Sequence, residues 1–489
     1  MAITRRQFLK CSGLATAGSI FGPSFFGNPF LQRAMAETIG DRYVIVIYLD
    51  GGNDGLNTVT PVTNGLGTLR TAYDAARDAN AATGGINLTP AQLAGTLVGT
   101  DPNTGCQLAI HPAMTGLKSL YDLGKVAVIQ NCGYPDYNLS HDESRQIWQT
   151  GDPPRTYLDG SGWLGRHLAA PTVGYTGADI PAIAIENRVP LELANALTSV
   201  LAIQNVREFD FPFDQYSNDD IALKEAAYQA LHDNAVATSQ PTMSYIGNTG
   251  LATFLVSQNY PALDGFYESS RPQAIRDAYD NVGRSLAFDL REVAKVITGV
   301  QQNVVTGNTA FPSVQARFFR VSNGGFDTHA DQGGADPNGQ HFSLLGEVSD
   351  SIEAFYNDMA DLGIADKVLI LTFSEFSRRI QQNENGTDHG SQAPMFIVGG
   401  SVVGGVYGNH PNLDDVDGEG NTRYSQDVLN DFRTTDFRDV YGTIMKHWLN
   451  MAPSTIIDPV TPANGALRLD VGDPNFYWTT ADLDMGFVV

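Results

Sequence analysis

Basic residues and long apolar runs are scarce in this 489-residue chain, which has only three cysteines. Its 30 lysines and arginines stand against 54 aspartates and glutamates, giving a formal net charge of −24. Because nucleic-acid backbones are bound through lysine and arginine, this balance excludes nucleic acid as the main partner. After the N-terminal segment no apolar run approaches the roughly 20 residues that a membrane span needs, so we expect no transmembrane segment. The remaining composition predicts an acidic, loop-rich globular protein.

Residues 1–36 have the pattern of an export signal. Residues 5–10 read Arg-Arg-Gln-Phe-Leu-Lys, a moderately apolar stretch follows, and small residues stand at Ala34 and Ala36. This pattern is typical of a twin-arginine signal cleaved after Ala36. We therefore expect the twin-arginine export machinery as a partner and a periplasmic or extracellular location. Cleavage would remove four basic residues and no acid, leaving a net charge of −28. Cys106 and Cys132 would remain, either paired in an oxidising compartment or as two buried free thiols.

Short apolar runs rich in β-branched residues predict buried strands along the chain. The first covers residues 43–49 and leads into Asp-Gly-Gly-Asn-Asp-Gly, a sequence that favours a tight loop. Similar runs occur at 126–130, 182–185, 316–321, 367–373 and 395–398. Helical periodicity separates some of them, most clearly over 344–362. Buried strands that alternate with helices predict an α/β fold with a mostly parallel sheet flanked by helices.

Two segments differ from this alternation. Residues 187–310 have helical patterns at 221–232, 243–258 and 273–300 with no clear strand between them, so we expect a helical insertion within a single domain over 37–489. A separately linked domain is disfavoured because no linker of proline and serine flanks the segment. The acidic run at 414–420 is predicted to be a polar surface turn, with a calcium-binding loop as the alternative.

Carboxylates and imidazoles gather near the ends of the predicted strands, where sites form in open α/β sheets. The candidates in chain order are Asp50, Asp327, His329, Glu375, Asp388 and His389. Such side chains hold divalent metals, and the sequence leaves Zn²⁺, Mn²⁺, Mg²⁺ and Ca²⁺ open. Each candidate also has a structural alternative: Asp50 could cap a turn, and Glu375 could pair with Arg378 or Arg379 on the surface.

The segment after the strand at 126–130 supplies the candidate catalytic residues. It contains Ser140 and His141 at the start of a predicted helix, with Arg145 about one turn further on. Ser140 could simply cap this helix, with Glu143 as its capping-box partner. Alternatively its hydroxyl faces an anion at the helix N-terminus, where Arg145 adds a positive charge.

Taken together, these segments resemble the alkaline phosphatase/sulfatase superfamily. They look still more like a large bacterial family of twin-arginine-exported proteins of unknown function that is related to it. The likeness covers most of the chain after residue 36, with matching segments at 49–57, 140–151, 160–166, 325–329, 374–376, 386–390 and 436–438. The resemblance implies that Asp50 binds one metal and that Asp327, His329 and His389 bind a second. It further implies a small anionic ester as substrate.

Two positions depart from the superfamily pattern. Glu375-Phe376 stands where an Asp-His pair is usual, which removes one histidine ligand. His141 fits the position of the nucleophile as well as Ser140 does. Two functions therefore stay open at this point: an exported metal-dependent hydrolase of phosphate or sulfate esters, and a non-catalytic exported binding protein on the same scaffold. The acids and histidines at the strand ends favour the hydrolase.

Overall fold

A computed structural model of the chain gives the fold. It describes residues 42–77, 85–134, 137–153, 160–171, 173–175, 179–209, 220–238, 240–307, 310–311, 313–411, 413, 435–451, 467–468, 477–478 and 485–488. The predicted export signal at 1–36 and the acidic run at 414–420 lie outside the described residues, so both stay predictions.

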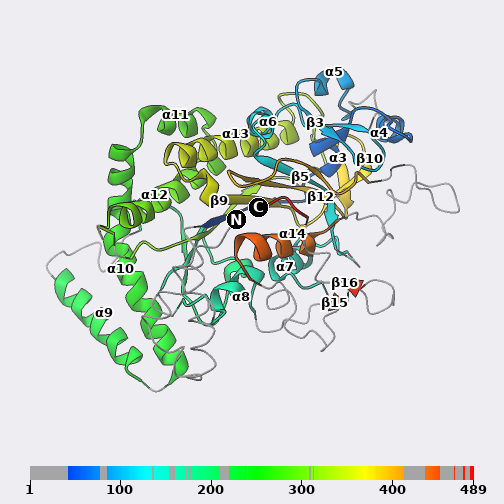
Figure 1. The fold of residues 1–489 in the computed structure, drawn as a ribbon. Helices are drawn as coiled ribbons and strands as arrows, with labels where there is room; N and C mark the ends of the chain where they lie inside the picture. Colours follow the sequence, from blue (N-terminus) through cyan, green and yellow to red (C-terminus); the bar gives the residue numbers. More distant parts are fainter. Residues whose placement is uncertain are drawn as a thin grey trace, which may run out of the picture.

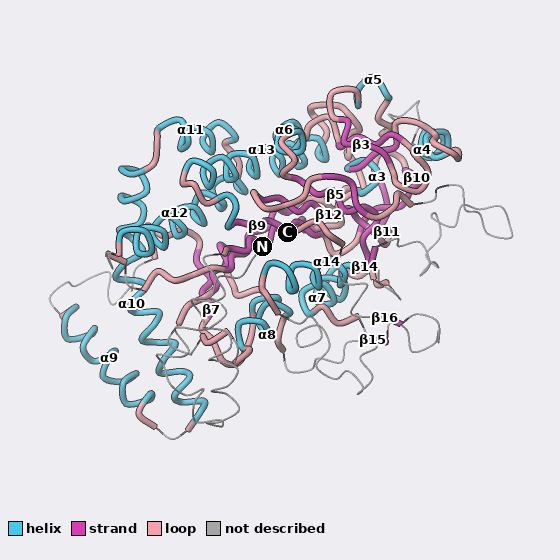
Figure 2. Tube along the Cα trace, viewed as in Figure 1, coloured by secondary structure: helices cyan, strands magenta, loops and turns pink. Residues whose placement is uncertain are grey.

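A nine-stranded sheet forms the centre of the molecule (Figures 1 and 2). Its order is β13-β5-β12-β9-β1-β8-β6-β7, with β14 beside β5. The strands are β1 (Tyr43–Asp50), β5 (Val126–Gly133), β6 (Ala182–Ile185), β7 (Val200–Ile203), β8 (Phe318–Gly324), β9 (Val368–Phe373), β12 (Ala393–Gly399), β13 (Gly405–Tyr407) and β14 (Thr435–Asp436). Only β12 runs antiparallel to its neighbours β5 and β9. The predicted mostly parallel sheet flanked by helices is confirmed.

The strand β7 was not expected from the sequence. It lies in the segment 187–310 before the first predicted helix, and it pairs in parallel with β6 at the edge of the sheet. The sequence analysis did not identify this four-residue strand, which has a single neighbour. The helical part of the segment begins later, at Ile221, and the bounds of the insertion stay a prediction.

Helices cover both faces of the sheet (Figure 1). One face carries α6 (Thr115–Asp122), α10 (Pro241–Ser270), α11 (Gln273–Val282), α12 (Ser285–Thr306) and α13 (Gln340–Asp361). The opposite face carries α7 (His141–Thr150), α8 (Trp163–Ala169) and α14 (Phe437–Thr443). The helix predicted at 344–362 is α13. At the periphery α9 (Ile221–Val236) packs on α10.

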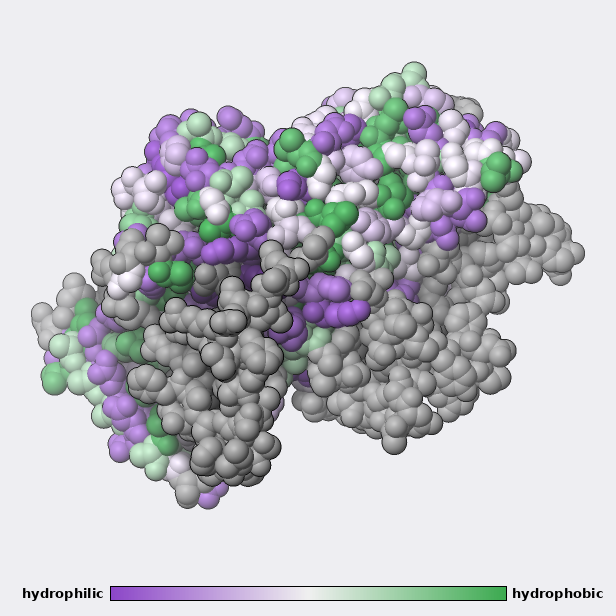
Figure 3. All heavy atoms as spheres, viewed as in Figure 1, coloured by the Kyte–Doolittle hydropathy of each residue, from purple (hydrophilic) through white to green (hydrophobic). Residues whose placement is uncertain are grey.

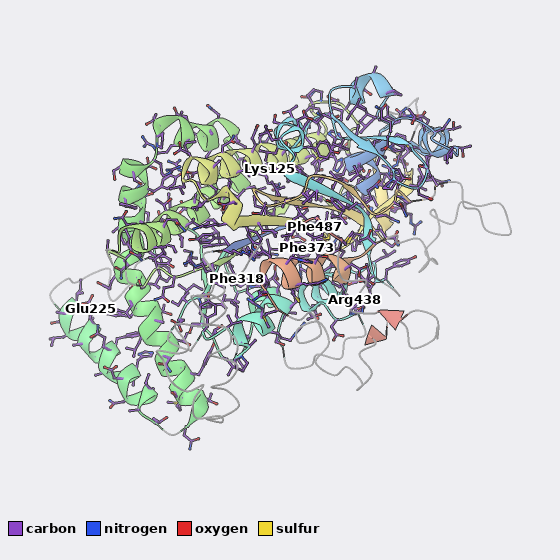
Figure 4. All side chains as sticks on the ribbon, in the orientation of Figure 1. Lys125, Glu225, Phe318, Phe373, Arg438 and Phe487 are labelled. Carbon is purple, nitrogen blue, oxygen red and sulfur yellow. The ribbon has the colours of Figure 1, made fainter. Side chains whose placement is uncertain are left out.

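The sheet separates two hydrophobic cores, and β1 contributes alternately to both. Ile45 and Ile47 belong to the core beneath α12 and α13, whereas Val44 and Val46 belong to the core beneath α7 and α14. This is the alternation of side chains expected along any strand. Both sides of β1 are buried from Tyr43 to Leu49, so this stretch contains no charged residue. Phe318, Phe373 and Phe487, which Figure 4 labels, lie in the second core.

Smaller elements surround the central sheet. They are α3 (Gly55–Thr58), β2 (Val59–Pro61), α4 (Leu69–Arg77), α5 (Pro90–Leu93), β3 (Leu97–Thr100), β4 (Gln107–Ile110), β10 (Ser377–Gln382), β11 (Thr387–Gly390), β15 (Leu467–Arg468) and β16 (Tyr477–Trp478). On the face shown in Figure 3, hydrophilic and hydrophobic residues are interspersed over the described part of the chain. No described helix is both long and apolar enough to cross a membrane. Cys106 and Cys132 are buried free thiols, so the disulfide alternative is not realised.

His167 on α8 makes the stability of this fold sensitive to acid. Its side chain is fully buried against Phe318, and burial lowers the pKa of the imidazole to about 3. The unfolded chain binds a proton there below a pH of about 6.5, while the folded chain does not until about pH 3. The buried neutral ring therefore stabilises the fold above about pH 6.5. This contribution to stability is lost progressively as the pH falls from about 6.5 to about 3.

We expect the variant His167→Leu to remove this loss. Between pH 7.5 and pH 5, the free energy of unfolding should fall by about 2 kcal/mol more in the wild type than in the variant. Urea unfolding of both proteins at the two pH values measures the difference. Equal losses would contradict the assigned pKa.

Candidate functional site

Three adjacent parallel strands bring most of the predicted site residues to one edge of the sheet. Strand β1 lies between β8 and β9, and the three run in the same direction. The loop after β8 carries Asp327 and His329, and the loop after β9 carries Glu375. The hairpin of β10 and β11 returns His389 to this edge, and α7 begins there at His141.

Four of these side chains form a compact group, here called the histidine cluster: His141, Asp327, His329 and His389. One ligand atom each from His141, Asp327 and His389 lies within 4.8 Å of the others. The Nε2 atom of His389 is 3.1 Å from Oδ1 of Asp327, and that of His141 is 3.6 Å from Oδ2. The Nε2 atom of His329 is 3.2 Å from the same Oδ1 and 3.0 Å from Nε2 of His389.

Each histidine of the cluster has a separate acceptor at its Nδ1 atom. The distances are 2.7 Å from His141 to Glu375 Oε1, 3.0 Å from His389 to the carbonyl of Leu139 and 3.3 Å from His329 to Asp388 Oδ1. A neutral imidazole that donates from Nδ1 presents a lone pair at Nε2. The Nε2 lone pairs of the three histidines then face the carboxylate of Asp327. All four groups are electron-pair donors, so a bound cation would satisfy them together. The donor set therefore fits a bound divalent metal.

Arg378 fixes the carboxylate of Asp327. Its guanidinium is fully buried and donates to the carbonyls of Gly52 at 2.8 Å and Thr387 at 3.0 Å, and to Asp327 Oδ1 at 2.5 Å. Burial of Asp327 acts to raise the pKa of its carboxyl group, but the hydrogen bond from Arg378 and the contacts with His389 and His329 outweigh it and lower this pKa to about 2. Asp327 is thus an anion throughout the physiological range, and 48% of its side chain is exposed to an incoming ligand.

The pKa values of the neighbouring histidines His141 and His389, whose ring centroids are 4.7 Å apart, shift in opposite directions. The hydrogen bond with Glu375 raises the pKa of His141, against the opposing effect of burial. Burial lowers the pKa of His389, although Asp327 opposes that shift. A proton and a divalent metal compete for the same nitrogen of His141, so metal binding there would release the proton.

A glycine allows the first strand to approach the cluster. Gly51 has a φ of +122°, and a Cβ atom at this position would lie 2.3 Å from the backbone nitrogen of Asp327. Its amide donates to Oε1 of Glu375 at 2.9 Å. Glu375 is completely buried and holds His141, so it is not the surface partner of Arg378 or Arg379. The Asp-Gly-Gly sequence that predicted a tight loop therefore supports the site through its backbone.

The other predicted residues lie outside the histidine cluster. Oδ1 of Asp50 accepts a hydrogen bond from the hydroxyl of Tyr48 at 2.9 Å, and Asp50 lines a neighbouring cavity together with Arg145. Ser140 is exposed at the N-cap of α7, but its side chain makes no capping hydrogen bond, so the capping box is not formed. Asp388 is half exposed and orients His329.

Sequence reasoning missed the role of Arg378 and the orienting roles of Glu375 and Leu139. Arg378 is one of two consecutive arginines, and the pairing of β10 with β11 places it opposite His389. No local pattern distinguishes it from Arg379. The carbonyl of Leu139 acts through the backbone and leaves no trace in the identity of the residue.

Comparison with known proteins adds little about the activity. No curated protein matches the chain. Among solved structures, the chain is similar to the PsFucS1 sulfatase from Pseudoalteromonas sp., with 10% identity, a TM-score of 0.30 and coverage of 83% of this chain and 74% of that one. It is also similar to the lipoteichoic acid synthase LtaP from Listeria monocytogenes, with 9% identity, a TM-score of 0.29 and coverage of 82% and 81%. At these TM-scores neither likeness says anything about the activity of this chain. Residues 264–432 match the model of a family described as a protein of unknown function (DUF1501).

Proposed function

We propose that this chain is an exported metal-dependent hydrolase of phosphate or sulfate esters. The observation that carries the proposal is the convergence of three Nε2 atoms on the ionised carboxylate of Asp327, with each Nδ1 atom held by its own acceptor. Such acceptors behind ligating histidines fix the ring orientation and raise the basicity of the ligand. The half-exposed carboxylate leaves room for a substrate at the metal.

The ligands we assign are His141, Asp327, His329 and His389. Three imidazole nitrogens and one carboxylate oxygen suit Zn²⁺ or Mn²⁺ better than Mg²⁺ or Ca²⁺, which prefer oxygen alone. Within the described residues there is a single group of three or more potential ligands at such distances. We therefore propose one metal per chain, with Glu375 and Asp388 as orienting carboxylates rather than ligands.

The residues around the cluster have separate tasks in the proposed reaction. A metal held there would polarise the ester and lower the pKa of the attacking group. Arg378 keeps Asp327 ionised and in place, and Glu375 keeps the Nδ1 proton on His141. Because both nitrogens of His141 are engaged, we assign the attack to the hydroxyl of Ser140, which precedes it and is free of a capping bond.

The proposal predicts metal content and turnover together. The full chain purified after growth with zinc and manganese should contain about one equivalent of metal, and it should hydrolyse 4-nitrophenyl phosphate or 4-nitrophenyl sulfate. Elemental analysis and release of 4-nitrophenol are the measurements, and Ser140→Ala should reduce turnover by at least about 100-fold while keeping the metal. A protein without metal that is inactive on both esters would contradict the proposal.

A non-catalytic binding protein is the second candidate. It is favoured by Phe376, whose ring lies 4.4 Å from that of His389 and 4.8 Å from that of His141. This aromatic side chain occupies space beside the ligands where the superfamily has a histidine. A protein that holds one equivalent of metal but turns over neither ester would support this function over the hydrolase.

A further inference from the structure

A polar cavity lies beside the histidine cluster and is not used by the proposed chemistry. Its volume is about 400 Å³, within the range of sites for small molecules. The charged and aromatic residues that line it are Tyr48, Asp50, Arg145, Glu186, Arg188 and Arg320. They come from β1, α7, β8 and the segment after β6, so rigid elements form most of the wall.

The cavity and the cluster share two elements of the fold. His141 and Arg145 are four residues apart on α7, which places them on the same side of the helix about 6 Å apart along its axis. Asp50 lines the cavity, and the next residue, Gly51, binds Glu375 behind the cluster. The cavity therefore lies about one turn of α7 from the cluster, within the reach of a small molecule that spans both.

The lining of the cavity is less acidic than the chain as a whole. Three arginines and two carboxylates line it, although the whole chain carries −24. Arg320 is neutralised by Glu186 and by Glu192, whose Oε1 accepts from its Nε at 2.8 Å. Arg188 is exposed at the rim and forms no ion pair with any described residue.

Arg145 is the second cation available to a ligand. Its partner Asp142 is largely exposed, with 77% of its side chain accessible, so water screens that pair. Together Arg145 and Arg188 present two guanidinium groups, which bind carboxylates in a fixed planar geometry. Gln146, Ser322 and Tyr48 add side chains that hydrogen-bond to hydroxyl groups.

We propose that this cavity is a second binding subsite for the part of the substrate beyond the reacting ester, and that this part is a polyhydroxylated acid of about the size of a uronic acid. Its carboxylate binds Arg145 and Arg188, and its hydroxyls bind the neutral polar side chains. The identification of the bound molecule as part of an ester substrate rests on the proposed function. Binding of the polyhydroxylated acid itself depends only on the residues of the cavity.

Two matched phosphate esters test the subsite on the metal-loaded chain. Glucuronic acid 1-phosphate and glucose 1-phosphate differ only in the carboxylate, and we expect kcat/KM to be about tenfold higher for the acid. The variant Arg188→Gln should bring this ratio close to one. The variant Arg284→Gln, which changes an exposed arginine outside the cavity, should keep the ratio of the wild type.

Titration calorimetry of the metal-free chain with glucuronate and glucose separates the subsite from the ester chemistry. We expect glucuronate to bind, glucose to bind at least about tenfold more weakly, and Arg188→Gln to remove the difference. This result without turnover of any ester would leave the subsite standing and overturn the proposed function. Turnover of both esters at equal rates, with no binding of glucuronate, would overturn the subsite and leave the proposed function standing.

Discussion

Replacing Arg77 by methionine should lower the free energy of unfolding by about 3–5 kcal/mol. Arg77 ends α4 and forms an ion pair with Asp54, and neither side chain has any exposed surface. The Nη2 atom of Arg77 also donates to Oδ1 of Asp54 at 2.9 Å. The shorter methionine side chain would leave the carboxylate of Asp54 buried without its countercharge. Guanidinium chloride unfolding, monitored by circular dichroism, measures the loss.

Two further variants separate the buried charge from loss of packing. The variant Lys118→Met breaks an ion pair with Asp122 on α6, where 61% of the aspartate side chain is exposed. Because this pair is exposed to water, the free energy of unfolding should fall by less than about 1 kcal/mol. Adding Asp54→Asn to Arg77→Met should recover part of the loss, because the unpaired charge is then absent. If Arg77→Met costs no more than Lys118→Met, the buried pair of Arg77 and Asp54 contributes no more to stability than an exposed one.

The central sheet was predictable because its strands are buried on both faces. In β1 every residue from Tyr43 to Leu49 is buried, so the strand appears in the sequence as a continuous apolar run. The same holds for β5, β9 and β12, whose residues are all buried. By contrast, β7 is a four-residue apolar run like β6, but its burial alternates and it has a single neighbouring strand. Its position follows from packing against β6.

The site could be predicted only in part, since the sequence identifies strand ends but not the direction of each side chain. Asp327, His329 and His389 lie together, and their binding of a metal stays a prediction. Asp50 ends β1, but residues two apart on a strand share a face, and its side chain therefore turns toward Tyr48. Glu375 contacts the cluster through His141 alone. That contact depends on how closely the loop after β9 approaches α7, a distance which no local pattern encodes.

Replacing Asp327 by asparagine should weaken metal binding by at least about 100-fold and abolish ester turnover to a similar degree. The substitution removes the one anion on which the three Nε2 atoms converge. The fold should stay intact, but the fully buried guanidinium of Arg378 loses its carboxylate partner, so we expect the free energy of unfolding to fall by about 1–3 kcal/mol. Competition with a chromogenic chelator measures the affinity for zinc.

The variant Asp388→Asn provides the matched control for Asp327→Asn. Asp388 is equally exposed and of the same charge, but it contacts only Nδ1 of His329, at 3.3 Å. Because Asp388 only orients His329, its replacement should lower the zinc affinity by about tenfold. This is the low end of the range for residues that support a metal ligand. Both substitutions remove one negative charge. The ratio of the zinc affinities of the two variants therefore distinguishes a metal ligand from a supporting carboxylate. Equal and small losses in both would mean that zinc binds elsewhere and that Asp327 serves only to pair with Arg378.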